Sequence, residues 1–75
     1  MLITLPNGDG IELNLIKNVF YYPNKKYVVG CDVLKTGVAF IKVKSDEEGN
    51  AVRALLIRAV NDGDAFTQPD WSFMT

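Results

Sequence analysis

Apolar and polar residues alternate along most of residues 2–44, which is the pattern of β-strands with one buried face. Clusters of turn residues interrupt this pattern at residues 6–10, 23–26 and 34–37. Short turns join antiparallel strands, whereas parallel strands need long crossover connections. The pattern therefore predicts an antiparallel meander of about five strands. The predicted strands cover residues 2–5, 11–16, 19–22, 27–33 and 38–44.

The hairpin over residues 18–33 is predicted to organise the sheet, because its strands carry β-branched and aromatic residues on both faces. A two-residue loop at its turn sets Tyr22 against Tyr27 and brings Tyr21 and Val28 together on the opposite face. One face is then assigned to the core, and the other is left without an obvious cover. The residues assigned to the core face are Phe20, Tyr22, Tyr27, Val29, Cys31 and Val33.

Two flanking loops predict the registers of the neighbouring strands. In the first hairpin, a three-residue loop ending at Gly10 sets Leu5 against Leu13, whereas a shorter loop would mix apolar and charged residues on one face. A similar loop in the third turn sets Cys31 against Ile41. Both loops assign apolar residues to the same core face. The residues of the last strand that fall on the second face are Val38, Phe40, Lys42 and Lys44.

Residues 45–61 break the alternation and carry apolar residues at helical spacing. Ser45 and Glu48 match a capping box at the start of this segment, and Gly63 is placed to end a helix. The apolar stripe consists of Val52, Leu55, Leu56, Ala59 and Val60. The favoured fold is therefore α+β, a small antiparallel meander with one C-terminal helix packed on one sheet face. The alternative is a small all-β barrel with residues 51–60 as a further strand.

The chain is predicted to form a single α+β domain over residues 1–64, followed by a tail over residues 65–75. At 75 residues, the chain is near the lower limit at which a core stabilises itself. The tail is rich in apolar residues that would be a liability if they were exposed to water. We therefore expect the tail to pack on the domain or on a neighbouring subunit. The expected tail contacts are Phe66, Trp71 and Phe73.

Composition argues against most catalytic chemistry. The chain has no histidine, and this removes the commonest general base and the commonest metal ligand. Cys31 is the single cysteine, so an intrachain disulfide and a multi-thiolate zinc site are excluded. Its place on the core face indicates a small buried hydrophobe. The acidic groups at residues 46–48 and 61–64 are interpreted as solvated helix ends. We expect no enzyme, no catalytic residues, no metal site and no cofactor.

The net charge and the N-terminal residues indicate the cellular location of the protein. Eight basic and nine acidic residues give a net charge of −1, which provides no long-range field for nucleic acid or anionic membrane. The N-terminal stretch MLITLPNGDG lacks the basic and apolar regions of a signal peptide. A lone thiol suits a reducing compartment. The sequence therefore predicts a cytoplasmic protein with no membrane partner.

The second sheet face carries the main functional hypothesis. Aromatic residues typically anchor protein interfaces, and lysine stems often lie along the rim. The favoured function is thus a small non-enzymatic protein-interaction module. We expect a homo-oligomer, with a dimer as the favoured state, or a complex with another protein. The predicted interaction residues are Tyr21, Val28, Phe40, Lys42 and Lys44.

The alternative function is a single-stranded nucleic-acid-binding protein that uses the same face. Tyr21 and Phe40 would stack on bases, and Lys42 and Lys44 would hold the backbone. The slightly acidic charge balance of the whole chain argues against this alternative.

Overall fold

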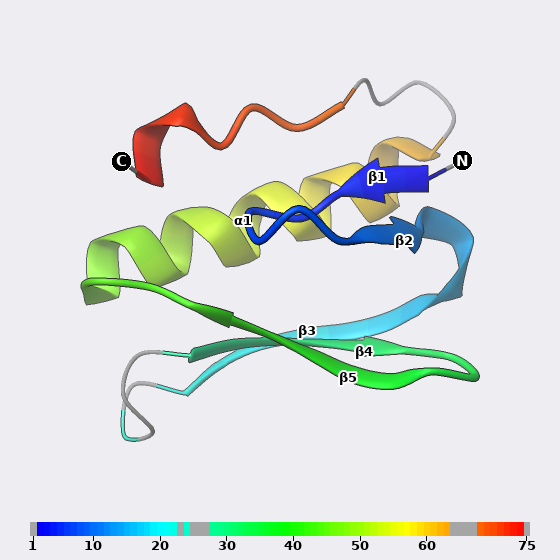
Figure 1. The fold of residues 1–75 in the computed structure, drawn as a ribbon, viewed down its shortest axis with the longest axis horizontal. Helices are drawn as coiled ribbons and strands as arrows, with labels where there is room; N and C mark the ends of the chain where they lie inside the picture. Colours follow the sequence, from blue (N-terminus) through cyan, green and yellow to red (C-terminus); the bar gives the residue numbers. More distant parts are fainter. Residues whose placement is uncertain (1, 23, 25–27, 64–67, 75) are drawn as a thin grey trace.

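The computed structural model describes residues 2–22, 24, 28–63 and 68–74, and in this part of the chain five strands form two antiparallel sheets beside one long helix (Figure 1). Strands β1 (Leu2–Thr4) and β2 (Gly10–Glu12) form a two-stranded sheet. Strands β3 (Ile16–Tyr22), β4 (Val28–Val33) and β5 (Gly37–Lys42) form a three-stranded sheet in that order. Helix α1 covers Asp46–Asp62. The α+β class predicted from the sequence is confirmed.

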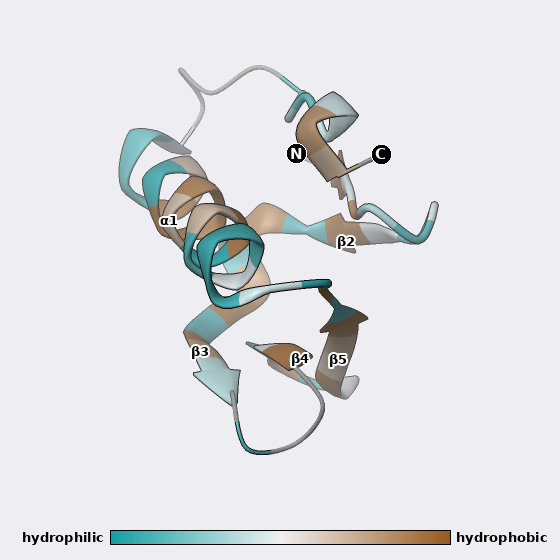
Figure 2. Ribbon diagram, turned by 90° about the vertical axis from the view of Figure 1, so that its left-hand side faces the viewer, coloured by the Kyte–Doolittle hydropathy of each residue, from teal (hydrophilic) through white to brown (hydrophobic). Residues whose placement is uncertain are grey.

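The elements form two layers. Helix α1 and the β1–β2 hairpin lie side by side on the same side of the three-stranded sheet (Figures 1 and 2). Helix α1 contacts β3 and β4, and the members of its predicted apolar stripe that are buried are Val52, Leu56 and Ala59. The core fills the space between the layers. Its buried residues are Ile3, Leu5, Leu13, Ile16, Val29, Cys31, Val33, Ile41, Val43, Val52, Leu56 and Ala59.

The strands do not form the single meander that the pattern predicted. Residues Leu13–Leu15 form a 3-10 turn, where the sequence predicted a strand over residues 11–16. This turn breaks the ladder between β2 and β3, and the β1–β2 pair becomes a separate sheet. Apolar residues at 11, 13 and 15 have the spacing of a strand, but in the structure only Leu13 is buried, while Ile11 and Leu15 are half-buried against the core.

The register of the first hairpin was also wrong. The predicted pairing of Leu5 with Leu13 would set Ile3 against Leu15, but Ile3 pairs with Ile11, because the loop consists of residues 5–9. The Leu5 N–H donates to the Asp9 carbonyl at 2.7 Å, and the Asp9 N–H donates to Asn7 Oδ1 at 3.0 Å. Such an Asx turn is a local alternative to the predicted glycine loop. The pairing differs from the prediction by an even number of residues, so Ile3 still points into the core.

The β3–β4 pairing differs from the prediction by one residue, and this exchanges the two faces of β3. Tyr22 pairs with Val28 and Phe20 pairs with Gly30, whereas the sequence set them against Tyr27 and Val29. Tyr21 therefore lies on the core face, opposite Val29. Both faces of β3 are apolar, so alternation alone gave no basis for choosing between the registers.

The β4–β5 pairing differs from the prediction by two residues. Cys31 pairs with Ala39, and Val29 pairs with Ile41. A shift of two residues keeps each side chain on its face, and Ala39 and Ile41 lie on the core face as predicted. Val33 pairs with Gly37, so the connection between these strands consists of residues 34–36.

The helix predicted after Ser45 is present, and a sixth strand over residues 51–60 is contradicted. Ser45 Oγ accepts a hydrogen bond from the Glu48 N–H at 3.2 Å, as the capping box requires. The Glu48 carboxylate accepts from the Lys44 N–H at 3.2 Å instead of returning to Ser45. At the other end, the Gly63 N–H donates to the Ala59 carbonyl. The helix packs on the predicted sheet, but on its Val29 and Ile41 face without Phe20.

Tyr21 joins β3 to the first turns of α1. Its hydroxyl donates to Asp46 Oδ1 at 2.6 Å. Its ring lies against the backbone at Gly49, where an added Cβ would stand only 2.6 Å from the Tyr21 Cζ. Gly49 is unfavourable for a helix by about 1 kcal/mol relative to alanine. The absence of a side chain at this position is what allows the tyrosine ring to reach the helix.

Replacing Gly49 with alanine is expected to destabilise the protein by about 1–2 kcal/mol, although helix propensity alone predicts a gain. The added methyl group would push the Tyr21 ring away from α1 and weaken its hydrogen bond to Asp46. Urea unfolding followed by circular dichroism measures the change. Asn50→Ala is the control, since Asn50 is an exposed neighbour on the same helix and should show the gain. A gain at both positions would contradict the packing argument.

Candidate interaction face

The face of the three-stranded sheet that points away from α1 is the candidate functional surface, called here the outer face. Directly opposed residues share a face, so the pairing defines three rows across the sheet. Its central row runs from Phe20 through Gly30 to Phe40. The flanking rows are Tyr22, Val28 and Lys42 on one side and Asn18, Asp32 and Val38 on the other.

Gly30 shapes the centre of the outer face. A Cβ added at this position would stand 2.9 Å from Phe20 Cδ2 and 3.2 Å from Tyr22 Cε2. The two rings therefore lean over the glycine backbone, with their centroids 5.4 Å apart. Aromatic side chains commonly cover a glycine on a neighbouring strand in this way. This packing fixes both rings of β3 and presents them as one rigid apolar surface.

Phe40 is the most solvent-exposed aromatic side chain of the outer face. Its exposed fraction is 60%, whereas Phe20 and Val28 are half-buried. Val38, two residues earlier on β5, is 42% exposed. Helix α1 and the β1–β2 hairpin occupy the other side of the sheet (Figure 2). At the edge of β5, however, Phe40 and Lys42 line a hollow together with Pro6, Asn7 and Met74. An apolar patch of this kind is typical of a contact surface.

Charged groups stand at opposite ends of the outer face. Lys42 is exposed in the row of Tyr22 and Val28. Asp32 is half-buried at the other end, where the Lys17 ammonium lies 3.9 Å from its carboxylate. The face therefore has an apolar centre, one cationic end and one end that contains an ion pair. Exposed pairs of this geometry contribute little stability, so the arrangement matters more for recognition than for folding.

The structure brings together three of the five predicted interaction residues. Val28, Phe40 and Lys42 share the outer face. Tyr21 belongs to the core face, so its predicted place was wrong. Lys44 is exposed beyond the end of β5, where its backbone bonds to Glu48. The sequence argument missed two aromatic residues of this face, and Gly30 was the signal that could have identified them. The missed residues are Phe20 and Tyr22.

The tail runs along β1, away from the outer face (Figure 1). The Trp71 Nε1–H donates to the Thr4 carbonyl at 2.6 Å, and the indole packs against the core. The Gln68 amide accepts from the Thr4 N–H at 3.1 Å and donates to the Leu2 carbonyl at 2.7 Å. Phe73 is 44% exposed and stacks at an angle on Trp71. The remaining predicted tail contact, Phe66, lies outside the described residues.

The lone thiol is poorly suited to chemistry. Cys31 is fully buried, and this burial raises the pKa of its thiol to about 11, with a further contribution from the nearby Asp32 carboxylate. A thiol with that pKa stays protonated at neutral pH and is a weak nucleophile. Among the described residues, no group of histidine, cysteine, aspartate or glutamate side chains is arranged to hold a metal ion.

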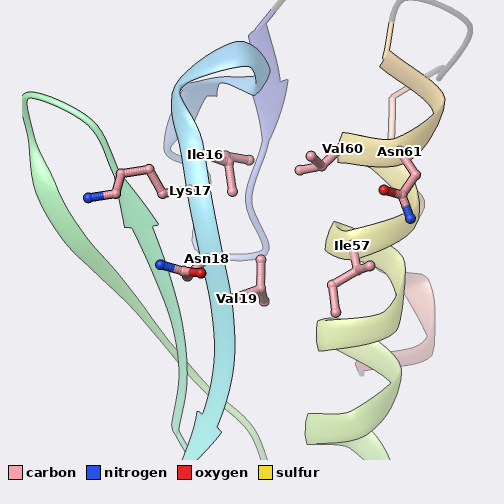
Figure 3. Close-up of a pocket in the computed structure, with 7 residues that line it drawn as sticks. All are labelled: Ile16, Lys17, Asn18, Val19, Ile57, Val60 and Asn61. Carbon is pink, nitrogen blue, oxygen red and sulfur yellow. The ribbon is translucent and has the colours of Figure 1, made fainter.

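A groove of about 280 Å³ separates the free edge of β3 from the second half of α1 (Figure 3). Ile16 and Val19 line it from the strand, and Ile57 and Val60 line it from the helix. Figure 3 shows Lys17 and Asn18 pointing to the opposite side of β3. Polar and apolar groups share the lining of the groove, because Lys17, Asn18 and Asn61 also belong to it.

No helix in the described part of the chain has the length and apolar character needed to cross a membrane. Comparison with known proteins finds no family model that matches the chain, no similar curated protein and no matching solved structure.

Proposed function

We propose that this chain is a small non-enzymatic protein-interaction module that associates with a second copy of itself through the outer face. The observation that carries the proposal is the central row, in which Phe20 and Phe40 flank Gly30 on an uncovered sheet face. Aromatic residues at the centre of a patch are the usual anchors of protein interfaces. The buried, protonated Cys31 and the absence of histidine favour contact over catalysis.

The outer face is complementary to itself under two-fold symmetry. A two-fold axis lying across the strands at the level of Gly30 sets the aromatic row of one copy against that of the other. The same operation places the Lys42 end of each sheet over the Asp32 end of its partner. Lys42 of each copy then lies over Val38 of its partner, next to the Asp32–Lys17 ion pair, and apolar groups meet at the centre. Two stacked sheets of this kind have the geometry of a β-sandwich.

The size of the face sets the expected strength of association. Three strands about 4.8 Å apart and six residues long cover roughly 300 Å². A standard interface buries about 800 Å² on each partner. We therefore expect a weak dimer that dissociates in the micromolar concentration range.

Replacing Phe40 with glutamate is expected to abolish the face contact. The side chain is 60% exposed, so the change should leave the fold intact while it places two carboxylates at the centre of the interface. Sedimentation velocity across the micromolar range measures the association, and circular dichroism checks the fold. Leu2→Glu is the matched control, since Leu2 is 61% exposed and lies on β1. The control should associate like the unchanged protein.

The outcome of this comparison separates the alternatives. Equal loss of association in Phe40→Glu and Leu2→Glu would contradict a specific role for the outer face. If the protein is strictly monomeric and binds single-stranded oligonucleotides at low salt, self-association is contradicted. The alternative function, in which bases stack on the same aromatic residues, would then be supported. In that case Lys42→Ala should weaken binding and reduce its salt dependence.

A further inference from the structure

The turn between β1 and β2 contains an asparagine in a reactive sequence. Asn7 precedes Gly8, and both residues are exposed. An asparagine before a glycine can lose its side-chain amide without an enzyme, because the next backbone nitrogen reaches the amide carbon most easily when no side chain hinders its approach. The other asparagines all precede residues with a side chain. They are Asn14, Asn18, Asn24, Asn50 and Asn61.

Gly8 stands in open space at the tip of this turn. Its φ is +95°, in the region that favours glycine, and a Cβ added there would meet no heavy atom within 4 Å. Exposed turn tips with small and polar residues are the parts of a domain that open most readily. The reactive pair therefore lies in a turn that can open while the core stays folded.

Hydrogen bonds within the closed turn hold the groups that would react. The Gly8 N–H donates to the Leu5 carbonyl at 2.9 Å, so the proton that this nitrogen must lose is kept from water. The Asn7 Nδ2–H donates to Asp9 Oδ2 at 3.1 Å, and this bond holds the side-chain amide in place. Opening of the turn releases both groups together. The reaction rate should therefore depend on how often the turn opens.

We propose that Asn7 is a site of spontaneous deamidation and that the reaction loosens the β1–β2 hairpin together with the tail. The proposal does not rest on self-association through the outer face. It assigns a modification to the cluster of turn residues at 6–10, which contributes nothing to the proposed contact surface.

The reaction balances with water as the only co-reactant. The Gly8 nitrogen gives its proton to hydroxide and forms a bond to Asn7 Cγ, and the bond from Cγ to Nδ2 breaks as ammonia leaves with a proton from water. Water then opens the succinimide ring that remains. Breaking the bond from Cγ to the Gly8 nitrogen gives aspartate, whereas breaking the bond from the Asn7 backbone carbonyl carbon to that nitrogen gives isoaspartate.

Both products disturb the turn. In the aspartate product an oxygen replaces Nδ2, so two like charges face each other where Asn7 now donates to the Asp9 carboxylate. In the isoaspartate product the backbone runs through Cβ, which lengthens the loop by one atom. The bond from the Leu5 N–H to the Asp9 carbonyl, which closes the loop at 2.7 Å, then loses its geometry.

The tail should respond to the same change, because it is held by the backbone of β1. Gln68 bonds to the Leu2 carbonyl and the Thr4 N–H, and the Trp71 indole donates to the Thr4 carbonyl. These bonds need β1 in its paired position beside β2. A hairpin whose turn is weakened should therefore expose the β1 amides and release the tail more often.

Incubation of the unchanged protein at mildly alkaline pH tests the reaction. Tandem mass spectrometry locates the mass increase that replaces an amide with a carboxylate, and enzymatic methylation detects isoaspartate. We expect Asn7 to be converted while Asn14 and Asn50 keep their amides. Conversion should be slower at neutral pH, because the Gly8 nitrogen must lose its proton before it attacks.

Variants at positions 7 and 9 connect the reaction to the fold. Asn7→Asp should show faster hydrogen exchange of the Leu2–Thr4 amides than the unchanged protein from the start. Asn7→Gln is the matched control, since it keeps an amide but can close only a larger ring, so its exchange should stay constant during incubation. Asp9→Ala removes the acceptor of the Asn7 amide, so Asn7 should be converted faster in that variant.

The outcomes decide the proposal directly. Conversion confined to Asn7, with exchange of the β1 amides rising in step with it and constant in Asn7→Gln, would establish it. Loss of the amide at Asn7 no faster than at Asn14 would overturn it, because the turn would then not be a modification site. Complete conversion of Asn7 with unchanged exchange at β1, in the aged protein and in Asn7→Asp, would overturn it as well, because the hairpin would not be loosened.

Discussion

Replacing Leu56 with alanine is expected to lower the free energy of unfolding by about 2–5 kcal/mol. The side chain is fully buried and belongs to the core cluster. A domain of this length has a total stability of only about 4–11 kcal/mol. The variant should therefore unfold at a much lower urea concentration, with an unchanged slope, when circular dichroism is followed through the transition.

Leu55→Ala is the matched control for this prediction. Leu55 is the adjacent residue on α1 and is half-buried, so the two changes alter helix propensity equally and differ in burial. We expect the control to lose less than half as much stability. Equal losses at the two positions would show that α1 does not bury the face that the structure assigns to it.

Whether an error in strand register is an even or an odd number of residues explains which parts of the sheet could be predicted from the sequence. Errors of two and four residues leave every side chain on its face, so Ile41 and Ile3 were correctly placed in the core although their partners were wrong. An error of one residue in β3 reversed the places of Tyr21 and Phe20. Alternation specifies a face only where the other face is polar, and β3 is apolar on both.

The helix was predictable for a different reason. The cap at Ser45 and the stripe of apolar residues are local signals, and local signals survive in any tertiary context. The place of Gly49 was not predictable, because it depends on the ring of Tyr21, which lies 28 residues earlier in the chain. From the sequence alone, a glycine in a helix is only unfavourable for the helix. In the structure it leaves the space that the Tyr21 ring occupies beside the helix.

The position of the tail also depends on contacts that have no sequence signature. A glutamine side chain that caps a strand edge looks like any other polar residue in the sequence. The apolar residues of the tail indicate that it packs on another surface, but nothing in the sequence identifies β1 as that surface. The candidate interaction face is therefore defined by the register of the three-stranded sheet, while the tail lies along β1 (Figure 1).

Replacing Trp71 with alanine is expected to cost about 2–4 kcal/mol and to release the tail from β1. The indole is half-buried against the core, and its Nε1–H donates to the Thr4 carbonyl at 2.6 Å. Trp71→Phe keeps most of the packing and loses the hydrogen bond, so we expect a smaller loss of about 1 kcal/mol. Thermal unfolding measures both losses, and hydrogen exchange of the Leu2–Thr4 amides reports the release of the tail.

Met74 of the tail lines a hollow with Phe40 and Lys42, but the Trp71 indole bonds to β1 and does not line that hollow. We therefore expect Trp71→Ala and Phe40→Glu to have independent effects. Trp71→Ala is expected to lower the stability of the fold and to leave self-association unchanged at temperatures where the protein is folded. Phe40→Glu is expected to abolish self-association and to leave the stability of the fold unchanged. Because mutations at separate sites usually add, the double variant should show the sum of both effects. If Trp71→Ala abolished self-association while hydrogen exchange at β1 stayed slow, the indole and its neighbour Phe73 would be the contact, and the outer face would not.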